Sequence, residues 1–239
     1  MKKRKGLKIT AAVLLILVLA VAMYAGDYYR ADAAAVTAMA GSETVTVEKN
    51  GNLTVFAPED PAAGFIFYPG GKVEHTAYAP LLLELAEEDI LCVLVEMPMN
   101  LAVLDANAAE GIPERFPDID SWYIGGHSLG GSMAASYAAD HADGLEGLVL
   151  LAAYSTADLT GTDLKVLLVR GDRDGVLNGE NYTRYIANLP ESSFELVITG
   201  GNHAQFGSYG PQEGDGEAAV SDTEQLETTV REILWLMEQ

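Results

Sequence analysis

The sequence predicts an α/β fold in which a mostly parallel sheet is covered by helices on both faces. Apolar runs of strand length, such as ILCVLVEMP at 90–98 and LKVLLVRGD at 164–172, alternate with helical segments. Continuous apolar strands are typical of parallel sheets that are buried on both faces. The length of 239 residues is enough for one domain with a substantial core.

The N-terminus predicts a membrane anchor. Residues 1–8 contain five cations, and 9–26 form an uncharged apolar run. Eighteen helical residues span about 27 Å, close to the bilayer core and longer than the apolar part of most cleaved signals. Tyr24 near the end of this run, and Tyr28 and Tyr29 just after it, fit an interfacial aromatic belt. We expect a single-pass protein of the cell membrane, with its domain outside the cytoplasm; the alternative is secretion after cleavage of a signal.

After this segment, we expect a linker or short helix at 27–42 and one α/β domain at 43–239. The alternating run at 44–58, centred on Asn50-Gly51-Asn52, predicts a hairpin that forms one antiparallel edge of the sheet. Ser221 and Glu224 fit a capping box at the start of the last helix. We predict strands at 62–71, 90–98, 121–126, 144–154, 164–172 and 193–201, and helices at 76–89, 101–116 (interrupted by Gly111 and Pro113), 129–142, 178–190 and 221–239.

Composition argues against some classes of function. Beyond residue 8, nine Lys and Arg stand against 35 Asp and Glu, so the domain repels polyanions and nucleic acid is a poor partner. The acidity itself is typical of a solubilising surface. The single cysteine, Cys92, lies in an apolar run, so we expect a buried side chain and no intramolecular disulfide.

The segment GGHSLGG at 125–131 follows a predicted strand and opens a predicted helix. It lacks the spacing of a dinucleotide fingerprint and the lysine of a phosphate-binding loop. It does match G-x-S-x-G, with Gly126, Ser128 and Gly130. Such a chain turns sharply at the serine, and the two glycines avoid a clash where the backbone comes close. The alternative is a serine that merely caps the helix.

A serine nucleophile needs a base and an acid. His203 follows the last predicted strand in a glycine-rich loop, at the same sheet edge as Ser128, and we predict that it is the base. Asp174, in the loop after the strand at 164–172, is our predicted acid. Asp172 is the alternative and Glu96 a weaker reserve. The other histidines are His75, which could line a site, His127 and His141.

The order Ser128, Asp174, His203 resembles that of the α/β hydrolases. The segments YPGGKVEHTAYAPLLLELA, GGHSLGG, RGDRDGV and GGNHAQFGSYGPQ resemble the small, lid-poor group near the dienelactone hydrolases over residues 43–239. This resemblance implies an oxyanion hole formed by the amides of Leu129 and Gly71. The chain departs from many relatives by Tyr68-Pro69-Gly70 in place of His-Gly. It also has serine where dienelactone hydrolase is expected to use cysteine, so lactone specificity does not follow.

Access to the site should be open, because the segment YSTADLTGTDL at 154–164 is too short for the lid that many such enzymes insert there. Candidate roof residues, for which ordinary packing is an equal alternative, are Met97, Met99, Tyr154, Phe206 and Tyr209. The acidic segment at 211–222 would disfavour anionic substrates.

Together these observations predict a carboxylesterase-like serine hydrolase that cleaves an ester or thioester of a small acyl substrate through an acyl-enzyme. We expect no metal and no organic cofactor. The alternatives are an acyltransferase or peptidase with the same triad, and a non-catalytic cell-surface binding module on a hydrolase scaffold.

Overall fold

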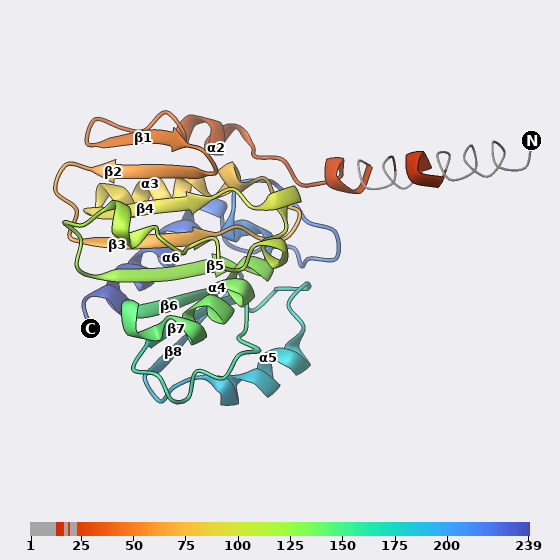
Figure 1. The fold of residues 1–239 in the computed structure, drawn as a ribbon. Helices are drawn as coiled ribbons and strands as arrows, with labels where there is room; N and C mark the ends of the chain where they lie inside the picture. Colours follow the sequence, from red (N-terminus) through yellow and green to blue (C-terminus); the bar gives the residue numbers. More distant parts are fainter. Residues whose placement is uncertain (1–12, 17–18, 20–22) are drawn as a thin grey trace, which may run out of the picture.

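A computed structural model describes residues 13–16, 19 and 23–239 and contains an eight-stranded sheet (Figure 1). The strand order is β1-β2-β4-β3-β5-β6-β7-β8, and every pair from β4 to β8 is parallel. The strands are β1 (Val45–Asn50), β2 (Leu53–Pro58), β3 (Ala63–Tyr68), β4 (Ile90–Val95), β5 (Trp122–His127), β6 (Gly147–Leu151), β7 (Lys165–Gly171) and β8 (Ser193–Ile198). The predicted mostly parallel sheet is therefore confirmed.

The antiparallel edge comes from the predicted hairpin. β1 pairs with β2 so that Asn50 lies opposite Leu53, which leaves Gly51 and Asn52 as the turn. Gly51 has φ +65°, a left-handed conformation that glycine adopts without steric cost. β2 then pairs antiparallel with β4 and joins the hairpin to the parallel strands.

Helices cover both faces of the sheet, as expected. The longer ones are α3 (Ala79–Glu87), α4 (Leu129–Asp140), α5 (Gly179–Tyr185) and α6 (Asp222–Met237). Alternate residues of β3 point into different apolar cores. Phe65 and Phe67 pack with α3 and α6, while Ile66 and Tyr68 pack with α4. This two-sided burial explains why strands such as β4 are apolar at every position.

The predicted helix at 101–116 is wrong. This segment contains only the short 3-10 turns η3 (Ala102–Leu104) and η4 (Pro113–Arg115), and it follows η2 (Pro98–Asn100). The hydroxyl of Tyr68 donates to the carbonyl of Ala106 (3.0 Å) and accepts from the amide of Ala109 (2.7 Å). Because a side chain from the sheet takes these two backbone groups, neither is available for the hydrogen bonds of a continuous helix.

Residues 27–42 are packed against the domain. Asp32 caps α2 (Ala33–Ala38) by accepting from two amides of its first turn, so the short-helix alternative is what forms. Upstream of it, Tyr29 bridges Val73 in parallel, with its amide donating to the Lys72 carbonyl at 2.8 Å. The chain between the predicted anchor and the domain therefore lies alongside the loop that follows β3 (Figure 1).

The predicted basic start at 1–8 and half of the predicted anchor at 9–26 lie outside the described residues. Within the described part of the chain, no helix is long and apolar enough to cross a membrane.

The connection between β6 and β7 is short, as the sequence predicts. It covers residues 152–164 and contains no helix or strand. Cys92 lies fully buried in β4, where burial raises the pKa of its thiol. The predicted inert role of this cysteine fits that position.

Candidate active site

Ser128 lies at the junction between β5 and α4 in an uncommon backbone conformation. Its φ of 53° and ψ of −121° are strained for a residue with a side chain, and such strain is concentrated at functional sites. Its amide donates to the carbonyl of Leu151 at 2.9 Å, which holds the turn against the neighbouring strand. The side chain is half-buried and does not cap α4. The helix-cap alternative is therefore not what the structure contains.

The glycines around Ser128 are required by contacts with backbone atoms. A Cβ on Gly126 would lie 2.6 Å from the Tyr68 carbonyl oxygen and 2.7 Å from the carbonyl carbon of Gly130. A Cβ on Gly130 would overlap the carbonyl oxygens of Tyr68 and Pro69. Since backbone atoms of a central strand cannot move aside easily, only glycine fits at either position.

Asp174 and His203 form a buried pair. Asp174 Oδ2 lies 2.8 Å from His203 Nδ1, and the two side chains are only 3% and 1% exposed. The second oxygen of Asp174 accepts from the amides of Val176 and Leu177, each at 2.8 Å. Burial alone would raise the pKa of Asp174, but the bonds from His203 and these amides outweigh it and lower the pKa. Asp174 is therefore an ionised acceptor that orients the His203 ring.

The alternative acids are engaged elsewhere. Asp172 accepts from the amide of Gly200 at 2.7 Å, and Glu96 pairs with Lys49 at 2.7 Å. Two of the other histidines also lie elsewhere. His75 Nε2 is 3.8 Å from Glu96 Oε2, and the ring of His141 stacks on Tyr137 of α4. Among the described residues, Asp174 is the carboxylate that bonds the His203 ring.

Ser128 and His203 lie at the same end of the parallel strands, Ser128 after β5 and His203 after β8. The ring of His127, the neighbour of Ser128, lies 4.5 Å from the His203 ring between centroids. Within residues 23–239, His203 Nε2 is buried without a hydrogen-bond partner, so it makes no bond to Ser128. Hydrogen bonds of this kind are often long in a free enzyme and tighten when substrate binds.

The loop after β3 leaves one amide available. Gly70 donates to the Tyr78 hydroxyl (3.0 Å), Lys72 to the Asn100 carbonyl (2.8 Å) and Val73 to the Gly70 carbonyl (3.2 Å). In the described part of the chain, the amide of Gly71 has no acceptor. This loop therefore keeps a single free donor beside the turn at Ser128.

Gly71 also lies next to the second predicted donor. A Cβ on Gly71 would be 3.0 Å from Leu129 Cδ2, so the two residues are in direct contact. Leu129 is the first residue of α4, where an amide has no partner within the helix. The structure thus brings together the two residues from which we predicted an oxyanion hole, each with an uncommitted N–H.

The sequence did not predict a hydrogen-bond network that joins Gly70, Tyr78 and His127. The Tyr78 hydroxyl lies 2.7 Å from His127 Nδ1 and accepts from the Gly70 amide. Because the hydroxyl already accepts from Gly70 and its own proton needs an acceptor, we assign Nδ1 as that acceptor, which places the His127 proton on Nε2. Burial lowers the pKa of His127 far below its usual value, and the nearby His203 ring adds to this effect. A neutral His127 therefore links the loop of Gly70 to the strand that carries Ser128.

Replacing His127 with asparagine should flatten the pH dependence of folding stability in weakly acidic solution. Because the folded pKa is lowered, the unfolded chain binds a proton that the folded protein does not as pH falls below about 6.5. Stability of the wild type should then fall by up to about 1.4 kcal/mol per pH unit from this residue. The variant should lack that slope, since asparagine does not titrate and its amide oxygen can still accept from Tyr78.

Urea unfolding of both proteins between about pH 7.5 and 5 measures this difference. Burial also lowers the pKa of His75, but that residue contributes equally to both proteins and cancels. Parallel curves for wild type and variant would contradict the assignment of a neutral, buried His127.

The predicted roof is only partly present. Met97, Phe206 and Tyr209 are buried within the two cores, and Tyr154 stacks on Tyr185. Met99 is 41% exposed, close to the Gly71 loop through its neighbour Asn100. For most of these side chains, ordinary packing is the better description.

These features define a class of α/β protein. They are the sheet order, the buried Asp-His pair and the sharp strand-to-helix turn at Ser128, which is called a nucleophile elbow in such folds. The model of the alpha/beta hydrolase family matches residues 64–227. The chain belongs to this family. No curated protein sequence matches the chain.

Solved structures with the same fold share little sequence with the chain. TT1662 from Thermus thermophilus has a TM-score of 0.60 at 13% identity, covering 82% of this chain and 99% of that one. Dienelactone hydrolase from Anabaena variabilis has a TM-score of 0.60 at 13% identity, covering 80% and 98%. A predicted CIB-like hydrolase from Thermoplasma acidophilum has a TM-score of 0.56 at 13% identity, covering 79% and 98%. At this identity the likeness is one of fold.

Proposed function

We propose that the protein is a carboxylesterase-like serine hydrolase that cleaves an ester or thioester of a small acyl substrate. The observation that carries the proposal is the buried 2.8 Å contact between Asp174 and His203, at the sheet edge where the strained turn presents Ser128. Burial of a charged carboxylate is costly even when it is paired, and buried titratable pairs of this kind are concentrated at functional sites. Membership of a hydrolase family supports the same reaction class.

In the proposed mechanism, Ser128 Oγ attacks the acyl carbonyl carbon while His203 Nε2 accepts the hydroxyl proton. Asp174 holds the ring by its Nδ1–H and stabilises the imidazolium. The amides of Gly71 and Leu129 donate to the oxygen that becomes negative. His203 then protonates the leaving alcohol or thiol, which leaves an acyl-enzyme. Water, activated by the same histidine, attacks that ester and releases the acid with the free serine.

The chemistry of the site supplies every step from protein groups. Among the described residues, no cluster of three or more His, Cys, Asp and Glu side chains could hold a metal ion. The short connection at 152–164 supports an open site and hence a small acyl group rather than a long enclosed chain. An acyltransferase or peptidase would use the same residues, and the non-catalytic alternative would leave the Asp174–His203 pair without a use.

A panel of p-nitrophenyl esters with increasing acyl length tests the proposal. We expect turnover with short acyl groups, a decline as the chain lengthens, and a loss of about 10⁴-fold or more in kcat for Ser128→Ala. A wild type that hydrolyses no ester, or a Ser128→Ala variant that is as active as wild type, would refute it. Adding an alcohol or amine acceptor in the same assay separates hydrolysis from acyl transfer.

We also propose that residues 9–26 anchor the protein in the cell membrane with the domain outside the cytoplasm, and that nucleic acid is not a partner. The basic start followed by an apolar run supports the anchor, and the acidic domain supports the exclusion. Carbonate extraction of membranes from cells that express the full chain would retain an anchored protein in the pellet, whereas a secreted product would appear in the medium.

A further inference from the structure

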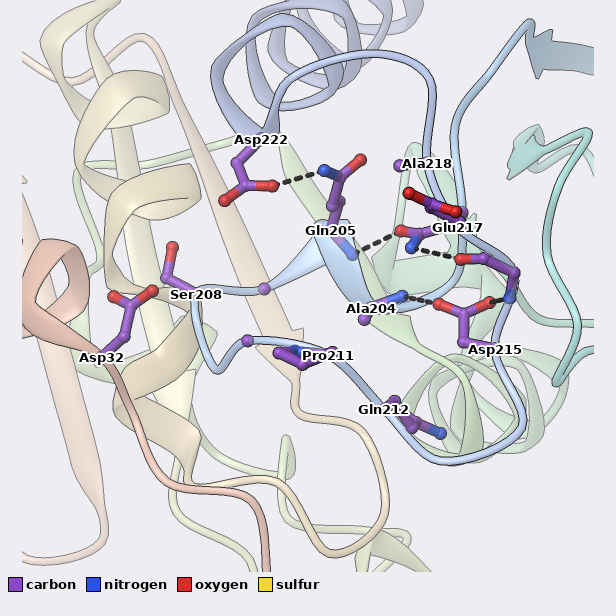
Figure 2. Close-up of a pocket in the computed structure, with 14 residues that line it drawn as sticks. Asp32, Ala204, Gln205, Ser208, Pro211, Gln212, Asp215, Glu217, Ala218 and Asp222 are labelled. Atoms are coloured by element: carbon purple, nitrogen blue, oxygen red, sulfur yellow. Dashed lines mark hydrogen bonds between the residues drawn. The ribbon is translucent and has the colours of Figure 1, made fainter.

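Asp215 connects the two loops that carry the acid and the histidine. Its Oδ1 accepts from the amides of Gly175 (3.1 Å), His203 (3.2 Å) and Gly216 (2.8 Å). Its Oδ2 accepts from the amide of Ala204 at 2.8 Å. Figure 2 shows this carboxylate between Ala204 and its own turn, at one wall of a hollow of about 470 Å³. One side chain thus bonds Gly175, the neighbour of Asp174, and both His203 and the residue after it.

The turn that carries Asp215 is packed tightly between these loops. A Cβ on Gly175 would lie 3.0 Å from the amide nitrogen of Gly216, and a Cβ on Gly216 would overlap the carbonyl oxygen of Arg173. On the other side, Asn202 Nδ2 donates to the Gly216 carbonyl at 2.9 Å. The turn therefore contacts the acid loop and the histidine loop at once.

Asp174 and His203 lie 29 residues apart on separate loops, which the bond from the Arg173 amide to the Gly201 carbonyl also joins. Their 2.8 Å bond requires both loops to keep the same relative position. A misplacement of about 1 Å in a catalytic group can cost about 100-fold in rate. Hydrogen bonds from backbone amides to a carboxylate are charge-assisted and about twice as strong as neutral ones.

We propose that Asp215 is a positioning residue that holds Asp174 and His203 in their catalytic arrangement. The inference rests on the proposed hydrolase function. Asp215 acts through backbone amides and does not bond the His203 ring, so its removal lowers the rate of the chemical step and leaves substrate binding intact.

Two substitutions separate the four bonds. In Asp215→Asn, the remaining oxygen can keep the three bonds at Oδ1, but the new NH₂ group faces the Ala204 amide, donor against donor. Asp215→Ala loses all four bonds. Asp222→Asn is the matched control, because Asp222 lines the same hollow, makes its side-chain bond to Gln205 Nε2, and loses the same unit of charge.

With p-nitrophenyl acetate, we expect kcat to fall about 10-fold in Asp215→Asn and about 100-fold in Asp215→Ala, with KM within about twofold of wild type. Asp222→Asn should stay within about twofold in both constants. A thermal melt confirms that each variant is folded, and Asp215→Asn decides the question if Asp215→Ala does not fold.

A second readout does not depend on turnover. In proton NMR, the Nδ1–H of His203 should give a far-downfield resonance because it is bonded to a buried carboxylate. This resonance should shift or broaden in Asp215→Asn and remain in Asp222→Asn. If wild type hydrolyses no ester, the proposed function fails, and the resonance still tests Asp215. A folded Asp215→Asn with wild-type kcat and an unchanged resonance would overturn the inference.

Discussion

Asp174→Asn should lower kcat by about 10⁴-fold, whereas Asp172→Asn should leave it within about twofold of wild type. The loss follows from the bonds at the carboxylate. Asp174 accepts from His203 Nδ1 with one oxygen and from the amides of Val176 and Leu177 with the other. All three partners are donors, so the side chain must be an acceptor on both sides.

Asparagine cannot satisfy both sides. If its NH₂ group faces His203, the ring must place its proton on Nε2, and that atom can then no longer accept the proton of Ser128. If its NH₂ group faces the two amides instead, donor meets donor in a buried site, at a cost of about 1–3 kcal/mol. The first arrangement removes the productive tautomer of His203, and the second keeps that tautomer only at this energetic cost.

Steady-state kinetics of the two variants, with thermal melts to verify folding, measure the effect. Asp172→Asn is the matched control, because it removes a carboxylate two residues away whose partner is the Gly200 amide. If Asp172→Asn abolishes turnover and Asp174→Asn does not, Asp172 is the acid and the assignment is wrong.

Gly130→Ala should destabilise the protein by about 3–5 kcal/mol, or prevent folding altogether. The added Cβ would overlap the carbonyl oxygens of Tyr68 and Pro69. These atoms belong to the end of a central strand and the start of the Gly71 loop, so relief of the clash requires β3 and α4 to separate. The substitution would therefore damage the elbow and the packing of the sheet together.

Gly179→Ala is the control for this prediction. Gly179 begins α5, and no atom would lie within 4 Å of an added Cβ. Alanine there should be neutral or stabilise the protein by up to about 1 kcal/mol. Urea unfolding compares the two variants, and equal stability of Gly130→Ala and wild type would show that the close approach at the elbow is absent.

The fold was largely predictable because local pattern and burial agree. Strands such as β4 are apolar at every position since both faces are covered, and the turn at Gly51 and Asn52 sets the hairpin register. The segment 101–116 was not predictable in this way. Its backbone is organised by the Tyr68 hydroxyl, whose partners lie 38 and 41 residues away, and helical periodicity carries no information about such a contact.

The residues of the candidate site were likewise predictable only in part. Ser128, Asp174 and His203 each follow a strand, so their order and the parallel sheet were enough to propose that they meet. Tyr78 and Asp215 could not be proposed, since their roles depend on tertiary hydrogen bonds. Tyr78 bonds the Gly70 amide and the His127 ring, and Asp215 bonds amides of the two loops that carry Asp174 and His203. The flanking glycines of Gly214-Asp215-Gly216 were a weak signal of a tight turn, but within an acidic segment they gave no indication of a partner.

The central claim is that Ser128 is a nucleophile activated by His203. The direct test is to label wild type, Ser128→Ala and His203→Ala with a fluorophosphonate and to locate the adduct by peptide mass spectrometry. We expect one adduct on Ser128 in wild type, none in Ser128→Ala, and labelling slower by at least about 10³-fold in His203→Ala. Folded wild type that carries no adduct, or an adduct on a residue other than Ser128, would contradict the claim.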